Sequence, residues 1–80
     1  MTHPELLSRV TAIFRDVLDD ERIILTDGTT AKDIEGWDSL SHFQLINALE
    51  REFGIRFTTE EIYSFQNIGQ ICGLIKGKLR

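Results

Sequence analysis

The sequence has a single cysteine, a single proline and no long apolar run among its 80 residues. Cys72 has no second cysteine with which to form an internal disulfide, which excludes a secreted disulfide scaffold and favours a reducing, cytoplasmic location. No apolar stretch approaches the roughly 20 residues that span a membrane, and residues 1–5 do not begin a signal peptide. His3, His42 and Cys72 lack the spacing of metal ligands, so no metal site is predicted.

Basic residues are outnumbered, with 9 against 13 acidic residues and a net charge of −4. Nucleic acid is therefore not expected as a partner, because binding it requires a coherent basic surface. From residue 63 onward the only charges are Lys76, Lys78 and Arg80. These cations lie at the end of a predicted helix, where they interact favourably with the helix dipole and need no functional explanation.

Apolar residues recur at helical spacing along most of the chain and predict an all-α fold. We expect one domain, residues 1–80, folded as a small four-helix bundle with three long helices and one short helix. The expected helices cover residues 4–18, 39–53, 58–63 and 68–79. Cys72 belongs to the apolar stripe of the last helix and is expected in the core.

A long connection, residues 19–37, separates the first two long helices. It is expected to pack against the bundle because it carries apolar residues of its own, namely Ile23, Ile24, Leu25, Ile34 and Trp37. Whether it contains a short helix or a strand stays open. Three other helix starts have the spacing of capping boxes, in Thr2 with Glu5, Thr58 with Glu61, and Asn67 with Gln70. Gly54 is expected to end the second long helix.

Ser39 begins that second helix within the string Gly-Trp-Asp-Ser-Leu, residues 36–40. Unpaired backbone N–H groups and the helix dipole favour an anion at this end of a helix. The local chemistry leaves two interpretations open. Ser39 is either the N-cap of the helix or a residue that carries a phosphate group.

Projected at about 100° per residue, the second helix separates two apolar groups. The core face gathers Leu45, Ile46, Leu49 and Phe53. Leu40, Phe43 and Asn47 fall outside it, next to Ser39. Exposed apolar side chains beside a polar anchor are typical of a transient protein interface. The alternative is that the connection folds over them.

An enzyme is disfavoured. Ser39 and His42 share a helix face, but a hydrolytic site also needs an orienting third group and an oxyanion hole in a shaped cleft. A bundle of this size supplies neither, and Asp38 cannot easily reach the far side of the imidazole. His42 projects near the core stripe and is expected to be a packed, partly buried side chain.

Through these residues, the chain resembles the acyl carrier protein family. The likeness rests on Asp38-Ser39-Leu40 and continues through residues 45–54, 60–62 and 71–75, so that it covers essentially the whole chain. The resemblance implies a four-helix bundle whose Ser39 carries 4′-phosphopantetheine, with an acyl group held as a thioester at the end of that arm. It implies carriage rather than catalysis.

The same resemblance assigns roles to the residues around Ser39. Asp38 would help a phosphopantetheinyl transferase and its divalent metal engage the serine. Partner enzymes that transfer, condense or activate acyl groups would contact the flank of the second helix at Leu40, Phe43, Gln44 and Asn47. The carrier is expected to be a monomer. Whether the bundle encloses the acyl chain stays open, because Phe43, Phe57 and Phe65 would narrow its interior.

The second helix departs from the fatty-acid members of that family, in which it is rich in Asp and Glu. Ser41, Gln44, Asn47 and Arg51 occupy positions that are often acidic or apolar there. Together with the lead-in at residues 33–37, this favours a specialised or polyketide-type carrier over bulk fatty-acid synthesis. An aminoacyl or peptidyl cargo, and a helical interaction module without a prosthetic group, remain as alternatives.

Overall fold

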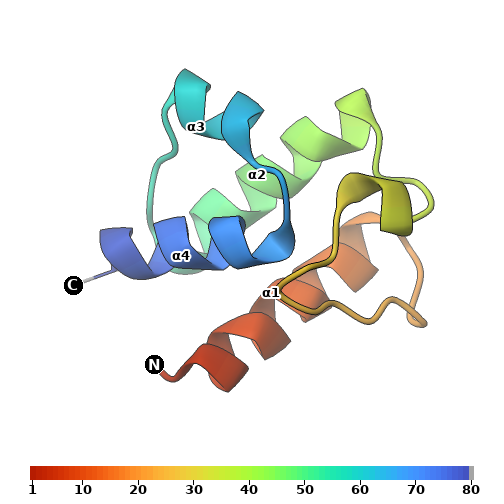
Figure 1. Ribbon diagram of the computed structural model, residues 1–80, viewed down its shortest axis with the longest axis horizontal. Coiled ribbons are helices and arrows are strands. Elements are labelled where there is room, and N and C mark those ends of the chain that lie inside the picture. Colours follow the sequence, from red (N-terminus) through yellow and green to blue (C-terminus); the bar gives the residue numbers. More distant parts are fainter. Residues whose placement is uncertain (80) are drawn as a thin grey trace.

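The computed structural model describes residues 1–79 and shows four α-helices and one short 3₁₀ helix (Figure 1). The helices are α1 (His3–Val17), α2 (Ser39–Phe53), α3 (Thr59–Ser64) and α4 (Ile68–Lys78), and the 3₁₀ helix is η1 (Ala31–Asp33). The predicted all-α class is confirmed, with helix limits within a residue or so of those expected. Arg80, the last of the three C-terminal cations, lies outside the described residues.

The start of each α-helix is fixed by a local hydrogen bond. Thr2 and Glu5 form the predicted capping box of α1, and Thr58 and Glu61 form that of α3. Only one of the two hydrogen bonds of the capping box expected at α4 is formed. The Asn67 side chain accepts the N–H of Gln70, but the Gln70 side chain accepts the N–H of Gln66 instead of that of Asn67 (2.8 Å).

The core lies between α1, α2 and α4 (Figure 1). Its fully buried side chains are Leu6, Val10 and Phe14 of α1, Leu45 and Leu49 of α2, and Ile68, Ile71, Cys72 and Ile75 of α4. Cys72 is thus in the core, as predicted. Gly54 ends α2 in the left-handed conformation (φ 64°), which glycine adopts without steric cost. Helix α3 has no buried residue and lies over α2 at the edge of the bundle.

The connection between α1 and α2 packs against this core through alternate residues. Ile23 and Leu25 are buried, and Ile34 and Trp37 are half-buried. Ile24, also expected to pack, is 74% exposed. The reason is that the chain is not helical here, so successive side chains point to opposite sides. The sequence left open whether the connection contains a short helix or a strand, and the structure shows the short 3₁₀ helix η1.

The connection also supplies hydrogen-bond acceptors to the start of α4. The N–H of Ile68 donates to the Thr29 carbonyl at 2.9 Å, and the N–H of Gly69 donates to the Asp27 carbonyl at 2.8 Å. A β-carbon at Gly69 would lie 3.0 Å from that carbonyl oxygen, so a larger residue fits here only if the connection shifts by a few tenths of an ångström. His3 of α1 contacts the Asp27 carboxylate at 2.8 Å. Residues 27–29 of the long connection are therefore fastened to both α1 and α4.

Candidate functional site

Asp38, and not Ser39, caps α2. The Asp38 carboxylate accepts the N–H of Ser41 at 2.9 Å, and the Ser41 hydroxyl accepts the N–H of Asp38 at 2.8 Å. This reciprocal pair is a capping box in which Ser39 is the first helical residue. The interpretation of Ser39 as the cap is therefore wrong, because its neighbour already performs that task.

Ser41 completes the turn and was missed as a structural residue by the sequence analysis. Its side chain is buried, and its hydroxyl donates to the Gly36 carbonyl at 2.7 Å. Ser41 thus ties the end of the connection to the first turn of α2, and it does not lie on the exposed face of that helix. A Ser at the third helical position after an Asp cap was the signal that could have revealed it.

Ser39 itself is exposed to solvent. Its hydroxyl takes part in none of the hydrogen bonds found among residues 1–79, since Asp38 and Ser41 satisfy the cap. The hydroxyl stands at the positive end of a 15-residue helix, where a phosphate group is favoured by about 0.3–1 kcal/mol when exposed. These features fit a serine that carries a phosphodiester.

Asp38 is exposed and remains charged at neutral pH. The backbone N–H of Ser41, followed by its hydroxyl, holds the pKa of the Asp38 carboxyl below its ordinary value. A charged carboxylate therefore lies directly beside Ser39 in the sequence. No cluster of three or more His, Cys, Asp or Glu side chains suited to a metal ion occurs within residues 1–79.

The apolar flank of α2 is open, as the helical projection predicts. Leu40 is 72% exposed and Phe43 is 42% exposed, so the connection does not cover them. Gln44 and Asn47 are exposed on the same helix. The four residues expected on the core face are all buried, namely Leu45, Ile46, Leu49 and Phe53.

Tyr63, which no pattern in the sequence singled out, extends this open flank onto α3. Its side chain is 70% exposed, and its ring packs edge to face against Phe43 with 5.9 Å between centroids. Leu40, Phe43 and Tyr63 together are called the apolar flank below. A short helix gives too weak a periodicity to assign its faces, which is why Tyr63 carried no signal.

His42 is half-buried behind this flank, as expected. The Trp37 indole N–H donates to His42 Nδ1 at 3.0 Å, and His42 Nε2 lies 2.7 Å from the Ile62 carbonyl oxygen. Both ring nitrogens are therefore engaged by other groups. Neither is available to take a proton from Ser39.

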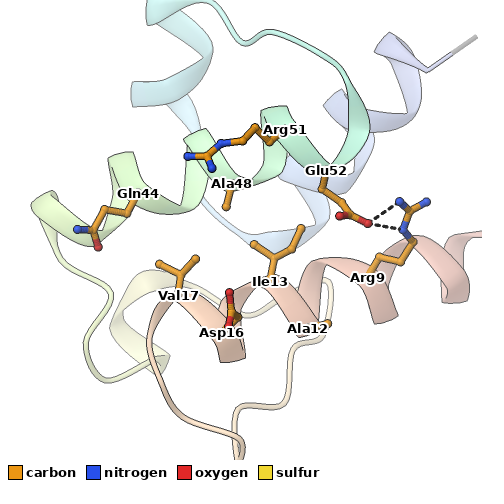
Figure 2. A pocket seen from close by; sticks show the side chains of 9 residues that line it. All are labelled: Arg9, Ala12, Ile13, Asp16, Val17, Gln44, Ala48, Arg51 and Glu52. Carbon is orange, nitrogen blue, oxygen red and sulfur yellow. Dashed lines mark hydrogen bonds and ion pairs between the residues drawn. The ribbon is translucent and has the colours of Figure 1, made fainter.

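A shallow groove, which Ser39 does not line, runs between α1 and α2 (Figure 2). Its floor is apolar, with Ala12, Ile13, Val17 and Ala48, and its rim is polar, with Arg9, Asp16, Gln44, Arg51 and Glu52. The Arg9 and Glu52 side chains form an ion pair across it. Phe57 and Phe65, which were expected to narrow the interior, pack edge to face at 5.5 Å, whereas Phe43 faces outward.

No helix described within residues 1–79 combines the length and the apolar character that a membrane span requires.

Comparisons with known proteins agree with this geometry. A family model for the phosphopantetheine attachment site matches residues 8–75. The acyl carrier protein of Thermosynechococcus vestitus is 32% identical over 80 residues, covering 99% of this chain and 98% of that protein. The acyl carrier protein of Petrotoga mobilis is also 32% identical, covering 99% of this chain and 93% of its own length.

A solved structure gives the same answer for the fold. The solution NMR structure of holo acyl carrier protein from Geobacter metallireducens is 44% identical, with a TM-score of 0.85. The match covers 91% of this chain and 84% of that one. The chain therefore belongs to the acyl carrier protein family, whose members are phosphopantetheine-bearing carriers rather than catalysts.

Proposed function

We propose that the Ser39 hydroxyl is the attachment point of 4′-phosphopantetheine, and that residues 1–80 act as a single carrier domain. The observation that carries this proposal is the exposed Ser39 hydroxyl at the start of α2, left without a hydrogen bond within residues 1–79. The hydroxyl oxygen forms a phosphodiester, and the thiol at the far end of the arm holds an acyl group as a thioester. The arm supplies the thiol chemistry, and the protein determines where the arm is attached.

The carrier works by delivery. A flexible arm keeps the acyl group near any enzyme docked on the carrier, so the enzyme meets it at a high effective concentration. Docking is weak and fast, with charge setting orientation and on-rate more than affinity. Catalysis belongs to the partner enzyme, because both nitrogens of His42, the histidine closest to Ser39 in sequence, are occupied.

The residues around Ser39 divide into two roles in this proposal. Asp38, charged and exposed, engages the phosphopantetheinyl transferase and its divalent metal while also capping α2. Leu40 and Phe43, together with Gln44 and Asn47, contact the partner enzymes. The support is their exposure on the same helix as Ser39, with apolar area that a partner can bury.

The pathway we propose is a specialised one of fatty-acid, lipid or polyketide type. Between Asp38 and Glu50 no residue of α2 is acidic, in contrast to the acidic helix described above for fatty-acid carriers. The carrier acts as a monomer, as the family resemblance implies, and in the cytoplasm, as the single cysteine favours. Intact-mass analysis of the loaded protein purified from its source distinguishes an acyl cargo from the alternative aminoacyl or peptidyl cargo.

Two serines in the same turn provide the test. The protein is incubated with coenzyme A, magnesium and a broad-specificity phosphopantetheinyl transferase, and its intact mass is measured. We expect one added group on the wild type and none on Ser39→Ala. The matched control Ser41→Ala keeps Ser39 and should still be modified. A folded wild type without a mass increase would instead favour the helical interaction module.

The two variants should also differ in stability, and here Ser41→Ala is the one that is affected. Ser41→Ala leaves the Gly36 carbonyl and the Asp38 N–H without their buried partner, which costs about 1–3 kcal/mol of unfolding free energy. Ser39→Ala removes an exposed hydroxyl and should stay within about 0.5 kcal/mol of wild type. Urea unfolding of both measures the difference, and equal losses would place the Ser39 hydroxyl in the cap.

A further inference from the structure

A continuous row of aromatic rings crosses the molecule from α1 to the segment between α2 and α3. Neighbouring rings of the row have centroids 5.0 to 6.1 Å apart, which is the spacing of rings in contact. In order, the row consists of Phe14, Trp37, His42, Phe65 and Phe57, and it is called the ring row below. Its two end members are buried and the three between them are half-buried, so the ring row is part of the packed structure.

The ring row closes the seam between α2 and α3. His42 comes from α2, and Phe65 follows directly after α3. Two hydrogen bonds hold the imidazole, one with the Trp37 indole at Nδ1 (3.0 Å) and one with the Ile62 carbonyl at Nε2 (2.7 Å). Because an indole N–H only donates and a carbonyl oxygen only accepts, His42 accepts at Nδ1 and donates from Nε2. Parting the two helices would leave these half-buried polar groups without partners, which is costly.

This seam begins next to Ser39. Residues three apart are neighbours on a helix surface, so His42 stands beside Ser39 on α2. The outer edge of the same seam is spanned by Phe43 and Tyr63, whose ring centroids are 5.9 Å apart. A chain that starts at Ser39 therefore meets these contacts before it can pass between α2 and α3.

The core that borders the ring row is also filled. Phe14 and Phe57 belong to the core, and Ile62 and Phe65 pack against it. Close-packed interiors contain few voids larger than a water molecule, so an acyl chain could enter only by displacing side chains. The groove between α1 and α2 gives no way in, because it is shallow and Ser39 does not line it.

We propose that His42 and the ring row keep the bundle closed to its cargo, so that the carrier holds a short or polar acyl group outside the bundle. The inference rests on the proposed function, because the acyl group is attached through the arm on Ser39. It answers the question that the sequence left open, namely whether the bundle encloses the acyl chain.

The class of cargo follows from where the acyl group is held. Apolar surface left in water costs free energy in proportion to its area, so a long hydrocarbon chain outside the bundle is unfavourable. A short acyl group, or one that carries hydroxyl or carboxyl groups, exposes little apolar area and does not need shelter. Such a cargo suits the specialised pathway proposed above.

Acyl groups of different length test whether the seam stays closed. The transferase is supplied with magnesium and acetyl-, butyryl- or octanoyl-coenzyme A, which places each acyl group on Ser39 through the same arm. Amide NMR then compares the three loaded proteins, and we expect the signals of Ile62 and Phe65 to coincide in all three. Octanoyl-specific shifts there would show that the chain enters the bundle and would overturn the proposal. Octanoyl-specific shifts at Ile13 and Ala48 would place the chain in the groove and would equally overturn it.

The reactivity of the thioester gives a second measurement. Hydroxylamine cleaves each thioester, and its rate is compared with that of the same acyl group on free pantetheine. We expect the relative rates of the acetyl, butyryl and octanoyl forms to agree within about twofold, because enclosure would exclude the reagent and the water. A larger slowing of the octanoyl form would show that its chain is shielded by the protein, which would contradict a cargo held outside.

Two variants test the part played by His42. His42→Ala removes a ring from the seam together with both hydrogen bonds, and Phe43→Ala is the matched control that removes a ring from the outer face. Octanoyl-specific shifts at Ile62 and Phe65 should appear in His42→Ala and not in Phe43→Ala. Octanoylation should also slow the amide exchange of residues 59–64 by about tenfold in His42→Ala alone, since a bound chain stabilises the structure that holds it.

The outcomes separate this inference from the role of Ser39. A folded His42→Ala that shows no octanoyl-specific shifts would overturn the role given to His42. If that variant does not fold, the three acyl forms of the wild type decide the question by themselves. A wild type that accepts none of the three acyl groups would overturn both the role of Ser39 and this inference. Entry of the octanoyl chain into the loaded wild type would overturn the closed seam alone.

Discussion

The backbone amide of Ser41 lies 2.9 Å from a carboxylate oxygen of Asp38, so the first turn of α2 is held by an acceptor that titrates. The hydrogen bond lowers the pKa of Asp38 in the folded state relative to the unfolded chain. A carboxyl of this kind stabilises the fold above its unfolded pKa and loses that contribution as the pH falls through the folded one.

Asp38→Asn tests this dependence because asparagine is an equally good cap that does not titrate. The stability of wild type relative to the variant should be constant near neutral pH and fall once the pH drops below about 4. Urea unfolding along a pH series measures it. The other carboxyls with lowered pKa values, Glu5, Asp20 and Glu61, are present in both proteins and cancel. Parallel curves down to the acid limit would contradict the role given to Asp38.

The two faces of α2 predict unequal effects of truncation. Leu49 is fully buried, so Leu49→Ala should cost about 2–5 kcal/mol of unfolding free energy by opening a cavity. Phe43 is partly exposed and packs on Tyr63, so Phe43→Ala should cost less, about 0.5–1.5 kcal/mol, and slow turnover by partner enzymes. Chemical unfolding with a parallel transferase assay separates them. Equal costs would show that the helix faces are wrongly divided.

Two glycines of α4 should respond oppositely to alanine. A β-carbon at Gly73 meets no atom within 4 Å, so Gly73→Ala should stabilise the helix by up to about 1 kcal/mol. At Gly69 the same β-carbon lies 3.0 Å from the Asp27 carbonyl oxygen, and Gly69→Ala should destabilise the protein by displacing the connection. Thermal melting of the pair checks the prediction. A stabilising Gly69→Ala would mean that the connection can move away without cost.

The burial of Cys72 predicts how the protein reacts with a thiol reagent. Burial raises the pKa of its thiol to about 11, so it carries little of the reactive thiolate at neutral pH. Protein prepared without the prosthetic group should resist alkylation when native and react once when unfolded in urea. Attachment of the arm should add one fast-reacting thiol to the native protein. Mass spectrometry counts the labels, and rapid labelling of the unmodified native chain would contradict the burial of Cys72.

Much of the bundle could be predicted from the sequence because its signals are local. Helix α2 begins at Ser39 and ends before Gly54, as expected from the apolar spacing and the glycine. The capping boxes of α1 and α3 are made by neighbouring residues and were found in the same way. Short-range patterns of this kind determine the local structure without contacts from distant parts of the chain.

The candidate site was only partly predictable, since its details depend on contacts between distant segments. Asp and Ser are both good N-caps, and Asp38 rather than Ser39 caps the helix through its reciprocal hydrogen bonds with Ser41. Tyr63 joined the site only because α3 folds across α2. The pairing of His42 with Ile62 spans 20 residues and left no trace in local spacing.

The attachment of α4 to the connection has a consequence for how the molecule assembles. The first turn of α4 obtains its acceptors at Asp27 and Thr29 from the opposite half of the chain, so it cannot be completed until a long loop closes around α2 and α3. Contacts this far apart in sequence slow folding and bind the two halves into one cooperative unit. Proteolytic cleavage within the connection would therefore loosen the C-terminal helix, although every residue of that helix remained intact.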